Sequence, residues 1–169
     1  MKKRTTLFLI LALFLMSARG AVAGTATSNL NVSVNVVPAC VVSAAPINFG
    51  DYDGSTDGRS SGDISVTCAV NLPYNIALDK GLHLGGPGQV NSRHLADGSG
   101  NSIYYDLFRE GYSIRWGDLG FGDTYPQGDP LAAGGTGASQ TYTVNGFLWV
   151  GQFVPTGIYT DTVIVTVHF

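Results

Sequence analysis

The longest regular pattern in this chain is an alternation of apolar and other residues from Ile64 to Leu78. Side chains of a β-strand point to its two faces in turn, so a period of two predicts extended chain with one buried face. Pro73 lies on the other parity and lacks the N–H that a strand ladder needs, so we expect it to bend or break the run into two pieces. The apolar parity consists of Ile64, Val66, Cys68, Val70, Leu72, Tyr74, Ile76 and Leu78.

The same period returns along the rest of the chain, and no segment after residue 23 shows a helical period. Glycine, aspartate and proline separate the alternating runs. Short strands between such turn residues predict an all-β sandwich or barrel. Strands are expected at 41–49, 103–107, 112–116, 141–150 and 158–169, with a hairpin turn at 109–111 and long loops at 81–101 and 117–139.

The first 23 residues have the pattern of a cleaved secretory signal peptide. Basic residues occupy positions 2–4, an unbroken apolar run covers 7–16, and small residues at 21–23 provide a cleavage site. Ten apolar residues are too few for a bilayer span, which needs about 20. We therefore expect an exported protein with one domain, 24–169, and no stable membrane insertion.

The charge and the cysteines of the exported part narrow its possible functions. Residues 24–169 hold five basic residues against twelve acidic ones, a net charge of −7, which argues against nucleic acid and anionic lipid as partners. The two cysteines, Cys40 and Cys68, should form a disulfide in an oxidising compartment. A zinc site would need more Cys or His nearby than this pair has.

Two short motifs resemble functional sites but lack the context that the chemistry needs. Residues 58–62 read G-x-S-x-G around Ser60, yet a strand is expected directly after them where a nucleophile elbow needs a helix, so we expect a polar loop. Residues 53–58 resemble the start of a calcium loop, but Ile64 stands where a bidentate glutamate is required. The sequence therefore predicts no catalytic residue, no metal site and no cofactor.

The remaining polar and aromatic residues fit ordinary structural places. The histidines at 83, 94 and 168 show no metal-ligand spacing, and His168 is expected to face solvent. Asp106 and Glu110 flank the hairpin, where we expect surface placement. Five aromatic residues favour core and cross-strand packing, with a ligand platform as the alternative. They are Tyr104, Tyr105, Phe108, Tyr112 and Trp116.

Two alternating segments near the ends of residues 24–169 lack an evident partner. Residues 25–36 alternate apolar and polar side chains until Pro38, and no turn folds this strand back onto the next segment. The run that ends at Phe169 has no later segment to cover its free edge, and a bare apolar edge is an aggregation liability, so we expect it to have a partner. The apolar faces are Leu30, Val32, Val34 and Val36 in the first strand, and Val163, Val165, Val167 and Phe169 in the last.

Nine pieces of the chain, in order, resemble one known family. The ordered set is similar to the spore coat protein U domain, as found in pilin subunits of archaic, Csu-type chaperone–usher pili. The resemblance covers essentially the whole exported chain. The pieces are CVV at 40–42, INFGDY at 47–52, GDISVTC at 62–68, LPYNIALDKG at 72–81, Arg93, IYYDLF at 103–108, WG at 116–117, YTVNG at 142–146 and GIYTDTV at 157–163.

The resemblance implies an incomplete immunoglobulin-like β-sandwich at 38–169 that lacks its last strand. Residues 24–37 would be a donor strand, with the four apolar residues of 30–36 filling a neighbouring subunit's groove beside 163–169. The implied partners are neighbouring pilus subunits, a periplasmic chaperone and an outer-membrane usher. The implied role is an extracellular pilus subunit in surface attachment and biofilm formation. The alternative is a secreted coat or surface protein that binds carbohydrate or abiotic surfaces through loops 81–101 and 117–139.

Overall fold

The computed structural model describes residues 23–83 and 92–169, and within these ranges the chain forms β-strands and no helix. The predicted all-β class is confirmed. The expected signal peptide lies outside the described residues except for Ala23, and the described ranges contain no helix with the length and apolarity of a membrane span. The chain divides into two units, 1–35 and 36–169. The strands are β1 (Cys40–Ala44), β2 (Gly58–Cys68), β3 (Pro73–Leu78), β4 (Arg93–Ala96), β5 (Ser102–Arg109), β6 (Ile114–Arg115), β7 (Leu131–Gly134), β8 (Gln140–Leu148) and β9 (Val165–His168).

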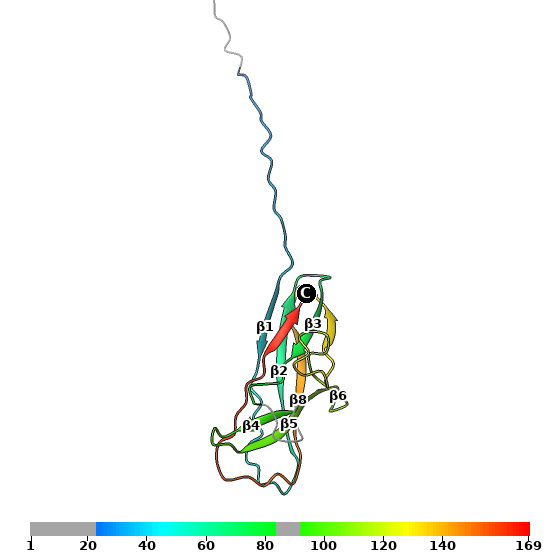
Figure 1. Ribbon diagram of the computed structural model, residues 1–169. Helices are drawn as coiled ribbons and strands as arrows, with labels where there is room; N and C mark the ends of the chain where they lie inside the picture. The colour runs from blue at the N-terminus through cyan, green and yellow to red at the C-terminus, as the bar shows by residue number, and fades with distance from the viewer. Residues whose placement is uncertain (1–22, 84–91) are drawn as a thin grey trace, which may run out of the picture. The chain divides into compact units, whose positions relative to one another are not determined.

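The strands of 36–169 form two antiparallel sheets (Figure 1). The larger sheet has the order β1-β2-β8-β5-β4, with β6 paired to β5, and the smaller one has the order β7-β3-β9. All the strand pairs of both sheets are antiparallel. Strands β1 and β9 therefore each end one sheet.

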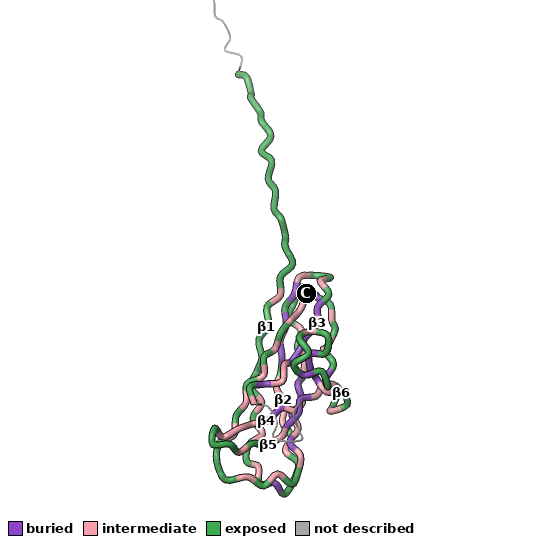
Figure 2. The backbone as a smooth tube through the Cα atoms, in the orientation of Figure 1, coloured by how far each residue is buried: buried purple, intermediate pink, exposed green. Residues whose placement is uncertain are grey.

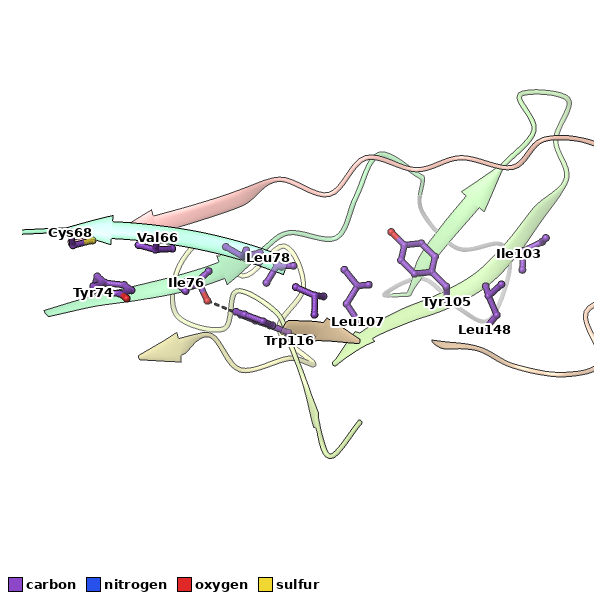
Figure 3. Packing of buried hydrophobic residues seen from close by; sticks show 12 residues of the cluster. Val66, Cys68, Tyr74, Ile76, Leu78, Ile103, Tyr105, Leu107, Trp116 and Leu148 are labelled. Atoms are coloured by element: carbon purple, nitrogen blue, oxygen red, sulfur yellow. Dashed lines mark hydrogen bonds between the residues drawn. The ribbon is translucent and has the colours of Figure 1, made fainter. Parts of the chain in front are cut away.

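The core lies between the sheets and follows the predicted alternation (Figure 3). Trp116 adds the largest buried side chain, and its indole N–H donates to the carbonyl oxygen of Ile76 at 2.9 Å. The run at 64–78 breaks before Pro73, and Val70 lies exposed in that turn. The buried cluster comprises Ile64, Val66, Cys68, Tyr74, Ile76, Leu78, Ile103, Tyr105, Leu107, Trp116, Val144 and Leu148.

Several predicted boundaries were wrong. Strands β4 and β7 lie inside the two segments expected to be loops. Each is too short to show a period in the sequence, and each becomes a strand because it pairs with a longer neighbour, β5 for β4 and β3 for β7. Residues 58–62 belong to β2 and pair with β8, so they are not a loop. The first strand ends at Ala44, and the last contains only 165–168.

Two glycines make room for the segment that follows β1. Gly62 on β2 and Gly146 on β8 share the inner face of the larger sheet with Ile64 and Val144. A Cβ at Gly62 would lie 2.9 Å from Ile47, and one at Gly146 would lie 2.7 Å from Phe49. Since glycine has no Cβ, the segment after β1 packs directly on this inner face.

The expectation that Asp106 lies at the surface was wrong, because it is fully buried. Its carboxylate accepts hydrogen bonds from Arg93 at 3.3 Å and from the Tyr125 hydroxyl at 2.9 Å, and it forms an ion pair with Arg115 at 2.8 Å. Burial raises the pKa of Asp106 above its ordinary value, and the Arg93 charge opposes that shift. Arg93 also donates to carbonyl oxygens of Leu78 and Trp116, so the network joins the two sheets.

The structure pairs Cys40 with Cys68, which are 28 residues apart and directly opposite each other on β1 and β2. We expect the double variant Cys40→Ser, Cys68→Ser to lose about 3.5 kcal/mol of unfolding free energy, because the loop it opens no longer restricts the unfolded chain. Urea unfolding of both proteins under the same conditions measures the difference. A loss below about 1 kcal/mol would contradict this account.

Candidate functional site

Strands β1 and β9 each have a ladder on one side only within the described residues. β1 pairs with β2, and β9 pairs with β3. The two strands come from different sheets and contact each other. A sheet edge presents a row of N–H and C=O groups that can pair with another strand. The place where β1 and β9 meet is therefore a candidate strand-binding site.

The inner face of β1 is open, although its neighbour is covered. Val42 is paired directly with Val66, yet Val42 is 38 % exposed and Val66 is fully buried. Likewise Ala44 is exposed opposite Ile64, which is buried. Figure 2 shows β1 mostly in the colour of exposed residues. The smaller sheet thus covers β2 but leaves β1 without a full layer above it.

The predicted edge residues of the last strand are also incompletely buried. Val163, Val165 and Val167 pack against the core but are only half-buried. The Asp79 N–H donates to the carbonyl oxygen of Ile164 at 3.1 Å, and hydrogen-bonded pairs alternate along an antiparallel ladder. The N–H and C=O groups of Val165 and Val167 therefore point away from β3, towards the open edge. Phe169 is 59 % exposed.

The segments that follow β1 and precede β9 line a cavity of about 690 Å³. Its apolar floor includes Ile103 and Leu148, which belong to the buried core. On its wall Phe153 and Ile158 are largely exposed. The sequence reading missed these two residues together with Val42, Ile47 and Phe49, although Val42 shares the parity of Cys40.

The residues expected to donate a strand cross the boundary between the two units, which falls after Asn35. Residues 23–39 belong to no strand, and the apolar side chains at 30–36 are all more than four-fifths exposed. Alternation alone had predicted a strand there. The exposed fractions of Leu30, Val32, Val34 and Val36 are 87 %, 86 %, 86 % and 81 %.

The polar motifs noted in the sequence hold structural places. The Ser60 hydroxyl donates to the carbonyl oxygen of Asn48 at 2.7 Å, on a strand and not on an elbow. Hydrogen bonds from the hydroxyl and N–H of Ser55 hold the pKa of Asp53 below its ordinary value. Among the described residues no three acidic, His or Cys side chains come together as a metal site. The expectation that His168 faces solvent was wrong. His168 is half-buried, and its ring centre lies 4.7 Å from that of Phe121.

The five aromatic residues lie in two places, and both are the core or cross-strand packing that the sequence favoured. Tyr105 and Trp116 belong to the core. Tyr104, Phe108 and Tyr112 instead join a half-buried ring cluster with Phe147 and Trp149. Tyr104 stacks on Trp149 at 4.5 Å, and the Arg59 guanidinium lies 4.8 Å from the Phe147 ring centre. Phe147 and Trp149 were not among the candidate aromatic residues named from the sequence. Both lie on the face of β8 and its extension opposite to Leu148.

Comparison with known proteins agrees with this architecture. The family model of the Spore Coat Protein U domain matches residues 26–166. The chain belongs to this family. It is 31 % identical over 167 residues to Protein U of Myxococcus xanthus, with 88 % of each protein covered.

A solved structure extends the likeness to a pilus protein. It is the crystal structure of the CsuC–CsuE chaperone–tip adhesion subunit pre-assembly complex from archaic chaperone–usher Csu pili of Acinetobacter baumannii. The match to a chain of that complex has a TM-score of 0.56 and 27 % sequence identity, and it covers 79 % of this chain. This chain spans 40 % of the length of that one. The protein is thus a spore coat protein U domain with the fold of a Csu pilin-like subunit.

The cross-strand pair Val42 and Val66 tests the open face of β1. In the chain without an added strand, we expect Val66→Ala to lower the free energy of unfolding by roughly 2 kcal/mol, from two lost methylene equivalents and a small cavity. We expect Val42→Ala to cost less than about half of that, because water already reaches its side chain. Urea unfolding of the two variants provides a matched comparison, and equal losses would show that β1 is covered.

Proposed function

We propose that this protein is a structural subunit of a chaperone–usher pilus, polymerising by donor-strand complementation. The observation that carries the proposal is the half-exposed apolar edge formed by β1 and β9, with backbone groups of β9 directed outwards. An added strand would complete the smaller sheet and cover Val42 at the same time. Strand addition to an exposed sheet edge is an established mode of protein recognition.

The donor in this proposal is residues 24–37 of a neighbouring subunit. At about 3.3 Å per residue, the twelve residues 25–36 extend over about 40 Å as a strand, which is long enough to pair with the whole of β9 and to continue along 161–164. Leu30, Val32, Val34 and Val36 lie on one face of such a strand, towards the core of the acceptor, and the three polar residues between them face solvent. The period of two along this segment thus suits an acceptor with one buried face.

The energies fit a stable join between subunits. Four apolar side chains at roughly 1.5–3 kcal/mol each give about 6–12 kcal/mol as an upper bound. Ladder hydrogen bonds add to this value. Donor and acceptor are different surfaces of one chain, so the contact is head-to-tail, and contacts of that kind form filaments when they do not close into rings.

The partners and the location follow from the same proposal. Before assembly the open edge needs a temporary strand, which a periplasmic chaperone would supply, and an outer-membrane usher would exchange it for the next subunit's donor. The similar solved chain comes from a chaperone–subunit complex, which supports this assignment. The finished polymer would lie outside the cell, in surface attachment and biofilm formation. In this role the chain is structural and not an enzyme.

Val34→Asp tests the donor, with Asn35→Asp as the matched control. Both variants add one negative charge, but Val34 is on the apolar parity and Asn35 on the polar one. We expect Val34→Asp to abolish polymers in electron micrographs and size-exclusion profiles, because a carboxylate would enter an apolar groove. Asn35→Asp should polymerise normally.

Chaperone binding separates donor loss from misfolding in the same experiment. Both variants should still co-purify with the chaperone, since the donor of the subunit is not used in that complex. A chain lacking 25–36 should behave like Val34→Asp. Polymerisation of that deleted chain on its own, or equal loss of polymer and chaperone binding in Val34→Asp, would refute the proposal.

A second candidate is a secreted coat or surface protein that binds carbohydrate or an abiotic surface. The likeness to Protein U over 88 % of each protein and the ring cluster around Trp149 favour it. The two loops expected to bind also contribute to the fold, because they contain β4 and β7 and the second holds the buried Tyr125. Binding to a glycan array or to polystyrene by the Val34→Asp chain, lost on Trp149→Ala, would support this candidate.

A further inference from the structure

The residues just before β9 hold part of the proposed acceptor edge, yet they belong to no strand. Val163 lies in this stretch, 161–164. Thr160 forms an isolated bridge with Ala96, through reciprocal N–H to C=O bonds of 2.9 and 3.0 Å. Beyond that bridge, two aspartate side chains bond this stretch to the body of the domain.

Asp79, directly after β3, extends the ladder with its side chain. Its N–H donates to the carbonyl oxygen of Ile164, and its Oδ1 accepts the N–H of Ile164 at 2.8 Å. The carbonyl oxygen of Asp79 would ordinarily accept that second bond. Here it accepts hydrogen bonds from Arg93, from Nε at 2.8 Å and Nη2 at 2.6 Å. The carboxylate therefore replaces a backbone acceptor that the buried arginine has taken.

Asp161 makes the reciprocal connection from the edge to the body. Its Oδ1 accepts the N–H of Leu82 at 2.9 Å, and its Oδ2 accepts the hydroxyl proton of Tyr105 at 2.6 Å. Tyr105 is a core residue of β5, and both its burial and its bond to Asp161 raise its pKa, so the hydroxyl keeps the proton that it donates. Gly81 has a φ of +79°, and a Cβ there would overlap the Asp161 carboxylate.

We propose that Asp79 and Asp161 are positioning residues that pre-form the acceptor edge before a donor strand arrives. Asp79 ties the edge to the smaller sheet, and Asp161 ties it through Tyr105 to the larger one. Both bonds approach the edge from the side of the body, so they leave its open side free. Ordering these residues in advance removes their conformational entropy from the cost of binding. This inference rests on the proposed function, because it assigns the edge to donor uptake.

The test measures uptake of a fluorescent synthetic peptide of residues 25–36 by the full chain carrying Val34→Asp, which keeps its own donor from competing. We expect Asp161→Ala in this parent to slow peptide association at least tenfold, because the edge is no longer held. Asp161→Asn should stay within about threefold of the parent, since an amide accepts from Leu82 and donates to the Tyr105 oxygen. Tyr159→Phe, which removes a hydroxyl bond to Pro155 in the same segment, is the control and should not change the rate.

Amide hydrogen exchange supplies a second measurement. The Leu82 N–H donates to Asp161 and should exchange faster in Asp161→Ala than in the parent. The Ile164 N–H donates to Asp79 and should exchange faster in Asp79→Ala. If Asp161→Ala does not fold, Tyr105→Phe keeps the buried ring, removes only the hydroxyl, and should slow uptake as well. Equal association rates in the parent and in folded Asp161→Ala or Tyr105→Phe, or slow uptake in Asp161→Asn as well, would overturn the inference alone. Absence of uptake by the parent would overturn the proposed function and the inference with it.

Discussion

The proposed function depends on the vacant side of a β-ladder. Strands β1 and β9 each satisfy their backbone on one side, and they meet where the two sheets come together. Unpaired N–H and C=O groups beside half-buried valines favour one kind of partner, an extended chain with alternating apolar side chains. The rest of the sandwich can be understood as a support that holds these two edges in place.

That support depends on polar bonds as well as on apolar packing. Arg93 is fully buried and reaches carbonyl oxygens at the end of β3, while Asp106 balances its charge. Removing one partner of such a buried pair typically costs several kcal/mol, because the other charge is left without compensation. The same arginine occupies the Asp79 carbonyl oxygen and so leaves the Asp79 side chain to hold Ile164. The core network and the proposed acceptor edge are thereby linked.

The proposed donor and the proposed acceptor share one pattern. The proposed donor alternates apolar and polar residues from Leu30 to Val36, and the proposed acceptor alternates half-buried and exposed residues around Val165. A period of two thus describes both the proposed donor strand and the proposed acceptor edge. Membership of the Spore Coat Protein U domain family agrees with an exported structural role.

Local pattern determined the all-β class, the buried parity of 64–78, the break before Pro73 and the Cys40–Cys68 pairing, because alternation, proline and a lone pair of cysteines are visible in the sequence. The tertiary structure alone decided that β1 and β9 are the edges that meet, that Gly62 and Gly146 admit the chain after β1, and that Asp106 is buried. These facts depend on which distant strands pair. A carboxylate beside a hairpin has the same sequence context whether a distant arginine reaches it or water does. The sequence fixes the period of each strand, whereas only the assembled sheets decide which edge remains free.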